Sequence, residues 1–463
     1  MNFPAFADIA RRIADGAVPA THYAAQALAR IRTRDPGQCY TAITQERALA
    51  EALVSGAAQA AGSDLPLAGV PYAVKNLFDI AGLPTLAGAH LREQQPPAQA
   101  DAEVIRRLQA AGAVLTGAVN MDENAYGFTT ENTWYGTCRN PHDPSRLAGG
   151  SSGGSAVAVA DGMVPLALGS DTNGSVRVPS SLCGIFGLKP TFGRLPRNGS
   201  FPFVHSLDHV GLMTTRVADL ATAYDVLQGP CEDDPYCARR PAEPVAAALQ
   251  AAPARPLRVA VLGGYFQAWA NDEARRAVDM AAHVLNATDT VTLAQAELAR
   301  AAAFVITAAE GGNLHRATLA RHYQDYEPRS RDRLVAGSLV PASWVEQAQR
   351  LRRRFHAQVL TLLQHYDVLL APATPTSAPL IGTTAVPLND HFVPTAQAMG
   401  LLTQPISFIG LPVCVAPIWP GLGATAHLPL GVQLIAAPWR EDLCLNAARQ
   451  LEQAGIAMVR QAA

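Results

Sequence analysis

A run of glycine and serine that leads directly into apolar sequence is the feature of this chain that most constrains its fold. Residues 149–155 read Gly-Gly-Ser-Ser-Gly-Gly-Ser, and the apolar stretches 156–160 and 165–168 follow closely. A flexible Gly/Ser linker remains solvated and is flanked by polar sequence. Apolar flanks instead predict a buried segment, and glycines beside a buried element indicate tight turns whose backbone N–H groups face a ligand.

The alternation of helical and strand-like patterns predicts an α/β fold. Up to about residue 60, apolar residues recur at helical spacings of three or four. Short apolar runs separated by Gly and Pro follow, and the first of them, 67–75, predicts a buried strand that ends in Lys75. A helix over 102–112 and a strand over 113–117 come next, so we expect a central sheet covered by helices on both faces. Further strands are predicted at 257–262, 366–372 and 410–417, and further helices at 273–285 and 440–454.

The size and composition are those of a globular protein. At 463 residues the chain exceeds the usual size of a single core, so we expect one large domain with insertions or two closely packed domains. Apolar residues make up 49% and charged residues 16%, which excludes a disordered chain. The formal net charge of −2 provides no overall basic field for nucleic acid. The Pro- and Ala-rich stretch 229–256 is the best candidate for a linker or an insertion boundary.

Three features predict a cytoplasmic protein without a membrane segment. Residues 1–18 mix charged and apolar residues in a helical period, which indicates a folded amphipathic helix instead of a signal peptide. The apolar stretches are interrupted well before the roughly 20 residues that a bilayer span needs. The seven cysteines are scattered, as is typical of reduced thiols, and Cys231 and Cys237 have no second ligand pair for zinc. We therefore expect no metal and no other cofactor.

The sequence contains the parts of a serine nucleophile site but no histidine base. A hydroxyl attacks a carbonyl efficiently only when a base takes its proton and fixed donors meet the developing oxyanion. The segment Thr172-Asn-Gly-Ser175 offers consecutive backbone N–H groups beside a serine. The twelve histidines are dispersed, and no Gly-x-Ser-x-Gly elbow with a downstream Asp and His is present. Lys75, at the end of a predicted buried strand, is the alternative base.

These residues resemble the amidase signature family. The family's signature is matched by residues 149–155, 171–179 and 184–191. The separation of Ser151 and Ser175 matches that of the family's two serines, and Lys75 matches its catalytic lysine. The similarity covers nearly the whole chain and continues through 120–123, 130–132, 139–141, 367–372, 410–412 and 429–433. The resemblance implies one large amidase-signature domain over 1–463 with a central mixed β-sheet. Within it we expect a helical part at 1–60, a signature core at about 65–228, an insertion at about 229–256, and a part at 257–463 that completes the sheet and the substrate pocket.

The resemblance also implies roles for individual residues. Ser175 would be the nucleophile that forms the acyl-enzyme, Ser151 a bridging serine in a cis peptide, and Lys75 the base. A buried lysine suits this role, because burial disfavours the cation and leaves the neutral base available. The oxyanion hole would be formed by Thr172, Asn173, Gly174 and Ser175.

Other residues of the signature are expected to support the site. Asn173 stands where the family most often has glycine, so its side chain is expected to add a contact to the substrate. Asp171 and Arg177 are expected to form an ion pair that braces the loop, and Ser152 to hydrogen-bond around the bridging serine.

The resemblance leaves the acyl group open, because the family acts on fatty amides, indoleacetamide, malonamate, ureido acids and glutamine. The residue pattern of 329–354 looks most similar to that of the bacterial branch that hydrolyses 1-carboxybiuret in cyanuric acid breakdown. This similarity implies a small, polar, carboxylated amide or ureide as the substrate, and the release of ammonia. Within the same fold, the alternative is the glutaminase subunit of a tRNA-dependent amidotransferase. A non-catalytic scaffold subunit is the alternative from another class, and the intact Lys75, Ser151 and Ser175 count against it.

The basic segment 316–355 has two interpretations. It is either a solvated helical face paired with nearby acids, or it supplies an arginine that holds a substrate carboxylate in a bidentate contact. We name Arg329, Arg331 and Arg333, with Tyr126, as substrate-binding candidates. By resemblance we also expect a small helical accessory subunit, with a homodimer or heterotetramer as the assembly, and neither a membrane nor a nucleic acid as a partner.

We predict that Ser175→Ala abolishes amide hydrolysis while the fold and substrate binding persist, because one oxygen is lost and the backbone amides remain. A fluorophosphonate probe should label the wild-type protein and not the variant. Turnover by the purified variant above contamination with wild type would reject Ser175 as the nucleophile.

Overall fold

The computed structural model describes residues 3–35, 39–250 and 255–461. At its centre lies one sheet of eleven strands, in the order β1-β3-β2-β8-β10-β9-β16-β17-β13-β11-β12. The strands are β1 (Tyr40–Ile43), β2 (Pro71–Lys75), β3 (Val114–Val119), β8 (Leu166–Asp171), β9 (Phe186–Lys189), β10 (His209–Thr214), β11 (Val259–Leu262), β12 (Asp289–Val291), β13 (Val368–Pro372), β16 (Val413–Ile418) and β17 (Leu430–Ile435). Three two-stranded ribbons lie outside the sheet: β4 (Glu131–Asn132) with β5 (Gly136–Thr137), β6 (Arg139–Asn140) with β7 (Asp143–Leu147), and β14 (Ala385–Leu388) with β15 (His391–Pro394).

The sheet is mixed, as the sequence predicted. Strands β3, β2 and β8 are parallel neighbours, and so are β13, β11 and β12, whereas the strands between these groups pair antiparallel. Every residue of β2, β3 and β8 is buried. Strands covered on both faces are largely apolar, which explains why the short apolar runs predicted β2 and β3.

Helices cover both faces of the sheet, which confirms the predicted fold class. They are α1 (Phe6–Ala14), α2 (His22–Arg34), α3 (Gln45–Ala60), α4 (Glu103–Ala110), α5 (Gly153–Ala160), α6 (Arg177–Cys183), α7 (Val217–Leu227), α8 (Ala246–Gln250), α9 (Tyr265–Ala268), α10 (Asp272–Val284), α11 (Ala296–His322), α12 (Arg331–Gly337), α13 (Ala342–Leu362), α14 (Thr395–Met399), α15 (Gln404–Ser407) and α16 (Glu441–Gln453). Four short 3-10 helices add η1 (His90–Arg92), η2 (Glu123–Ala125), η3 (Tyr323–Asp325) and η4 (Gly423–Thr425). In the described part of the chain, no helix has the length and apolar character to cross a membrane.

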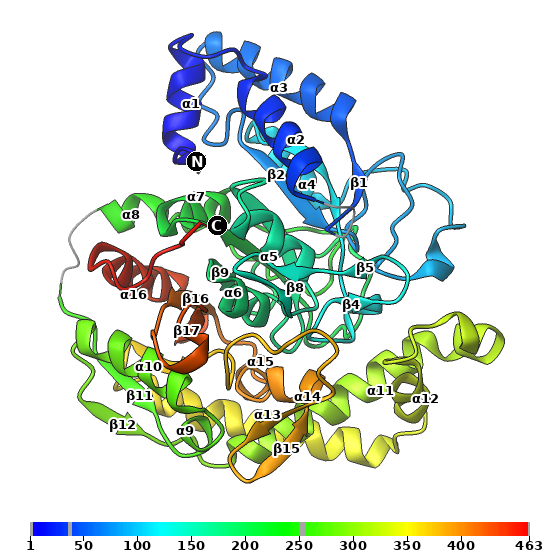
Figure 1. Cartoon of the computed structure of the whole chain (residues 1–463), viewed down its shortest axis with the longest axis vertical. Coiled ribbons are helices and arrows are strands. Elements are labelled where there is room, and N and C mark those ends of the chain that lie inside the picture. The colour runs from blue at the N-terminus through cyan, green and yellow to red at the C-terminus, as the bar shows by residue number, and fades with distance from the viewer. Residues whose placement is uncertain (1–2, 36–38, 251–254, 462–463) are drawn as a thin grey trace.

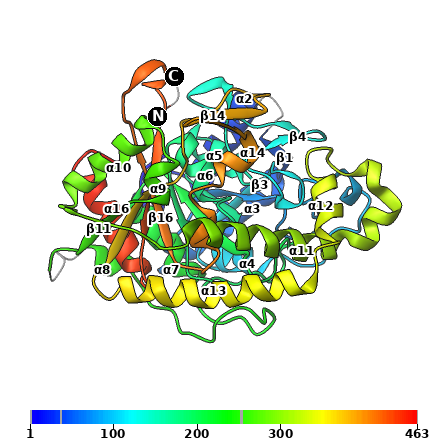
Figure 2. The same cartoon turned by 90° about the horizontal axis from the view of Figure 1, so that it is seen from below.

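The helices named here lie in three groups along the molecule. Helices α1 to α3 gather at one end, α11 and α13 run side by side at the other, and α5 and α6 lie between them (Figures 1 and 2). Helix α5 follows the Gly/Ser run, and all of its residues are buried. The run is therefore part of the packed core, which rules out a flexible linker.

The structure departs from the sequence prediction in two places. The N-terminal part contains the strand β1 between helices α2 and α3, which the helical pattern concealed because β1 has four residues and only one of them is buried. The strand predicted over 67–75 begins at Pro71, because Leu67 to Val70 form a turn. The stretch 229–256, predicted as an insertion boundary, contains α8, and its residues 251–254 lie outside the described residues.

Candidate active site

Two adjacent parallel strands bring the predicted lysine and the predicted serine loop to the same edge of the sheet. Strand β2 ends at Lys75, β8 ends at Asp171, and the two pair in parallel with Val74 opposite Leu168. The carboxyl ends of neighbouring parallel strands therefore place Lys75 beside the loop that leads to Ser175. Loops at this edge are where open α/β sheets commonly bind ligands.

Lys75 is fully buried and contacts two serine hydroxyls. Its Nζ donates to Ser151 Oγ at 2.7 Å and to Ser170 Oγ at 2.9 Å. The peptide bond between Gly150 and Ser151 is cis. The Lys75–Ser151 contact gives a path by which a proton can pass from a serine hydroxyl to an amine.

The glycines of the Gly/Ser run are required by close packing. A Cβ at Gly150 would lie 2.0 Å from Asp122 Oδ2, and a Cβ at Gly154 would lie 2.5 Å from the Asn120 carbonyl oxygen. Any side chain at these positions would force the neighbouring segment away. The run is thus packed against residues 120–122, another stretch of the sequence signature.

Ser152 joins the two loops of the site. Its backbone N–H donates to the Ser175 carbonyl at 3.2 Å, and its hydroxyl donates to the Ser170 carbonyl at 3.1 Å and accepts from the Ser170 N–H at 3.2 Å. The predicted hydrogen-bonding role of Ser152 is present in this geometry. The serine loop is therefore held at both of its ends.

A buried ion pair braces the loop 171–177. The guanidinium of Arg177 donates to both carboxylate oxygens of Asp171 at 3.0 Å, and neither side chain is exposed. Arg177 also reaches the Thr403 carbonyl, Ser407 Oγ and Gln433 Oε1. Burial alone would raise the pKa of Asp171, but the attraction of Arg177 outweighs it and lowers that pKa. Removing one partner of such a pair typically costs about 3–5 kcal/mol.

The predicted oxyanion segment is fixed from the other side by the residue that precedes α15. Thr403 Oγ1 donates to the Asn173 carbonyl at 2.7 Å. Gly174 has a φ of +140°, and a Cβ there would lie 2.2 Å from Thr403 Oγ1. Only glycine fits both the conformation and the space at this position. The backbone beside Ser175 is consequently rigid, as a preorganised donor set requires.

Burial controls the protonation of Lys75. It lowers the pKa of Lys75 to about 7, although the carboxylates of Asp122, Asp171 and Asp208 oppose the shift. Burial also raises the pKa of Asp122 to about 6, against the Thr130 N–H and the Lys75 cation. A large fraction of Lys75 is therefore neutral near pH 7, which an ordinary lysine is not.

Ser175 lines a pocket whose wall carries four aromatic rings and two arginine side chains. Its wall includes Arg300 and Arg333, and none of the described residues that line it is acidic. Its other lining residues are Ala125, Tyr126, Gly127, Phe128, Thr172, Asn173, Phe203, Phe304, Thr307, Ala396, Gln397 and Gln404. Within the described residues, neither Arg300 nor Arg333 has a carboxylate at ion-pair distance. Two arginines without a carboxylate at ion-pair distance favour an anionic ligand.

Only two of the four predicted substrate-binding residues line the pocket. Tyr126 and Arg333 line the pocket, with the guanidinium 4.0 Å from the ring centroid and Arg333 Nη2 donating to the Tyr126 carbonyl at 2.7 Å. Arg329 does not line it and instead donates to the Glu131 carbonyl at 2.7 Å. Arg331 lies over the ring of Tyr323. Of these three arginines, only Arg333, on α12, lines the pocket.

Several residues of the site were not named from the sequence. Ser170 and Asp122 lie within or beside the signature stretches, so their positions in the sequence could have suggested them. Arg300 and Gln404 lie on α11 and α15, and Arg300 Nε donates to Gln404 Oε1 at 3.1 Å. No local pattern marks either of them, because only the fold brings these helices to Ser175.

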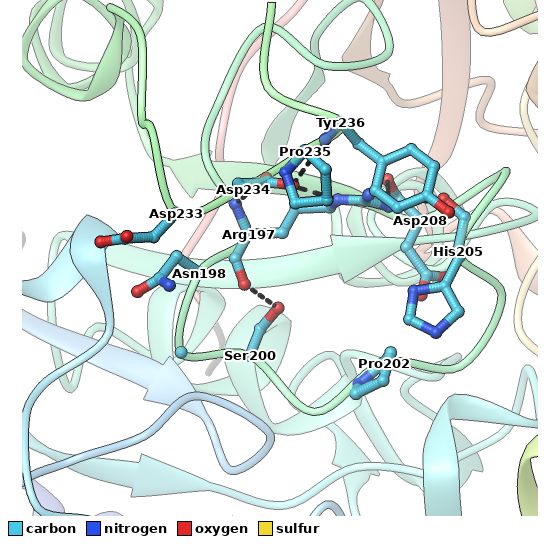
Figure 3. Close-up of a pocket in the computed structure, with 11 residues that line it drawn as sticks. Arg197, Asn198, Ser200, Pro202, His205, Asp208, Asp233, Asp234, Pro235 and Tyr236 are labelled. Carbon is cyan, nitrogen blue, oxygen red and sulfur yellow. Dashed lines mark hydrogen bonds and ion pairs between the residues drawn. The ribbon is translucent and has the colours of Figure 1, made fainter.

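A second pocket, about 600 Å³, lies beside the site and shares Asp208 with the cavity next to Ser170 (Figure 3). Asp208 accepts from Thr172 Oγ1 at 2.6 Å, and it is one of the carboxylates that favour the Lys75 cation. On the outer wall, the Arg197 N–H donates to Asp234 Oδ2 at 2.8 Å. Across the described residues, no cluster of His, Cys, Asp and Glu is suited to hold a metal ion.

Comparison with known proteins agrees with this geometry. The family described as Amidase matches residues 23–445. AtzE, the 1-carboxybiuret hydrolase subunit of Pseudomonas sp. (strain ADP), is 54% identical over 455 residues, which cover 98% of this chain and 99% of the relative. A glutamyl-tRNA(Gln) amidotransferase subunit of Nitratidesulfovibrio vulgaris (strain DP4) is 36% identical over 460 residues, covering 92% of each chain.

Solved structures show the same fold. A chain from a vestigial protein complex of an s-triazine catabolic enzyme superposes with a TM-score of 0.96 at 53% identity, over 99% of this chain and 100% of the other. The 6-aminohexanoate cyclic dimer hydrolase in complex with its substrate has a TM-score of 0.87 at 27% identity, over 99% and 98%. The resemblance seen in the sequence is thereby confirmed.

We predict that kcat/KM rises as the pH increases through about 7, because only the neutral form of Lys75 accepts a proton and burial lowers its pKa to about 7. Lys75→Met should be inactive across the whole range. Lys189 is a matched control, since burial also lowers its pKa to about 7 but its Nζ contacts the Pro190 and Leu411 carbonyls. Lys189→Met should keep the wild-type midpoint. A rate that climbs as the pH falls would contradict the lysine base.

Proposed function

We propose that this chain, which belongs to the amidase family, hydrolyses the terminal C–N bond of a small carboxylated ureide, 1-carboxybiuret or a close analogue, and releases ammonia. The chain is an amidase that acts on amide bonds other than peptide bonds. The observation that carries the proposal is the buried Lys75–Ser151 contact beside a pocket that holds Ser175 and two arginines without a countercharge.

The proposed reaction begins with attack of Ser175 Oγ on the amide carbonyl carbon. The proton of Ser175 passes to Ser151 as the Ser151 proton passes to neutral Lys75, and the backbone N–H groups of the loop ending at Ser175 receive the oxyanion. The tetrahedral intermediate collapses as the proton returns through Ser151 to the leaving nitrogen, and ammonia departs. Water then attacks the acyl-enzyme with Lys75 again as the base, and Ser175 regains its proton.

The environment of Lys75 supports its proposed role as the base. Complete burial lowers the pKa of Lys75 to about 7, so a large fraction of the amine is neutral at that pH, while three nearby carboxylates stabilise the ammonium ion when it forms. A proton acceptor works best when its pKa lies near the working pH. Because the two serine-bearing loops are held by Ser152 and by Arg177, the groups need not rearrange during the reaction.

The pocket supports a small anionic substrate. Arg300 and Arg333 can pair with a carboxylate, and the aromatic rings of Phe128, Phe203 and Phe304 surround the remaining space. The higher identity to the 1-carboxybiuret hydrolase relative than to the amidotransferase relative favours a ureide over glutamine as the substrate. Free glutamine would also bring an ammonium group, and no described residue that lines the pocket is acidic.

We predict that Arg300→Gln and Arg333→Gln raise KM for carboxylated substrates by about 10- to 100-fold and change KM for neutral amides little, because a hydrogen bond to a charged group contributes about 1.5–3 kcal/mol. Arg331→Gln is the control, since Arg331 lies over Tyr323 away from the pocket. Steady-state kinetics on succinamate and butyramide would measure the difference. Equal effects on both substrates would remove the arginines from carboxylate recognition.

We further propose that the chain works in a complex with a small helical accessory subunit, as a heterotetramer. The support is the close similarity to a chain found in a protein complex of an s-triazine catabolic enzyme.

We predict that the tagged protein, purified from its native cells, carries a second and smaller chain in a stoichiometric amount. Mass spectrometry of the intact complex would identify it. A homogeneous homo-oligomer with full activity would contradict the partner.

A further inference from the structure

The side chain of Asn173 holds an unpaired acceptor in the wall of the pocket. Asn173 is 6% exposed, and its Nδ2 donates to Thr307 Oγ1 at 2.8 Å. Its Oδ1 is buried and accepts no hydrogen bond from the described residues. The backbone of the residue is also fixed, because Thr403 donates to its carbonyl. The contact between Nδ2 and Thr307 therefore leaves Oδ1 as the acceptor that this amide offers to a ligand.

A buried acceptor without a partner is unfavourable unless a ligand satisfies it. Native proteins pair most buried polar atoms, so an exception in a pocket wall needs an explanation. The pocket has a second such atom, Tyr126 Oη, which is also buried without a partner in the described structure. Both atoms are suited to polar groups of a bound molecule, and neither suits a purely hydrocarbon chain.

The place of Asn173 in the loop indicates which part of the substrate it meets. It stands two residues before Ser175, in the segment whose backbone N–H groups are proposed to hold the oxyanion. A side chain in a segment whose N–H groups hold the oxyanion comes near the atoms bonded to the reacting carbonyl carbon, because the oxyanion and those atoms share that carbon. In a ureide one of those atoms is an N–H donor, whereas in a simple amide it is a CH₂ group.

We infer that Asn173 Oδ1 accepts a hydrogen bond from the N–H group next to the scissile carbonyl and thereby selects ureides over amides of the same shape. This inference rests on the proposed function and deepens it. Arg300 and Arg333 recognise the carboxylate, while Asn173 recognises the nitrogen on the acyl side of the bond that breaks. Glycine, the residue most common at this position in the family, has no side-chain acceptor and imposes no such choice.

Two stable substrates isolate this hydrogen bond. N-carbamoylglycine and succinamate have the same carboxylate, the same terminal carboxamide and nearly the same length, but the first has N–H where the second has CH₂. The quantity to measure is the ratio of their kcat/KM values in wild type, Asn173→Gly and Thr307→Val. Intrinsic reactivity cancels when the ratios are compared between variants.

Asn173→Gly should lower the ureide-to-amide ratio about tenfold or more, because a site built to bond an N–H discriminates against its absence. The ratio is the readout, because a general disturbance of the oxyanion segment lowers the rates on both substrates together. Thr307→Val should lower the ratio in the same direction but less, since it only frees the amide. An unchanged ratio in both variants would overturn the inference.

Binding measured without turnover separates this inference from the proposed function. In a Ser175→Ala background, calorimetry should give N-carbamoylglycine a lower Kd than succinamate, and adding Asn173→Gly should remove the difference. Equal Kd values before that change would overturn the role of Asn173, whatever the activity. Failure of the wild type to hydrolyse either substrate would instead count against the proposed function.

Discussion

The burial of a lysine amine at the end of a central strand is the constraint on which the rest of this structure depends. Lys75 is fully buried, so its hydrogen bonds come from the protein, and Ser151 and Ser170 provide them. Desolvation disfavours the ammonium ion and leaves a neutral base near pH 7. Strands buried on both faces of a large sheet create this dry environment, which a loop at the surface could not.

Close packing around the lysine explains the unusual sequence of the surrounding loops. The backbone of 149–155 lies against residues 120–122, and glycine is required where a Cβ would collide with Asp122 or Asn120. The loop 171–177 is held by a buried ion pair whose arginine also reaches Thr403, Ser407 and Gln433. Rigid loops of this kind place hydroxyl and N–H groups before the substrate arrives, and the chemistry of the family depends on that preorganisation.

The residues proposed to set substrate specificity come from other parts of the chain. The pocket beside Ser175 takes its charge from α11 and α12, while the proposed catalytic groups come from β2 and from the loops before α5 and α6. An amidase can therefore keep its reaction and change its substrate through residues of distant helices. In this chain the uncompensated arginines and the unpaired oxygen of Asn173 favour an anionic ureide, in line with its similarity to a 1-carboxybiuret hydrolase subunit.

The sequence alone determined the α/β class, the buried Gly/Ser run, and the strand that ends in Lys75, because hydrophobic period and glycine content are local properties. It also supplied the signature residues by resemblance. The edge strand β1 and the positions of Arg300 and Gln404 were decided only by the tertiary structure. Arg329, Arg331 and Arg333 are equivalent as residue types, yet the tertiary structure places only Arg333 in the pocket beside Ser175. A side chain's neighbours across a pocket come from segments more than a hundred residues apart, and no local pattern carries that information.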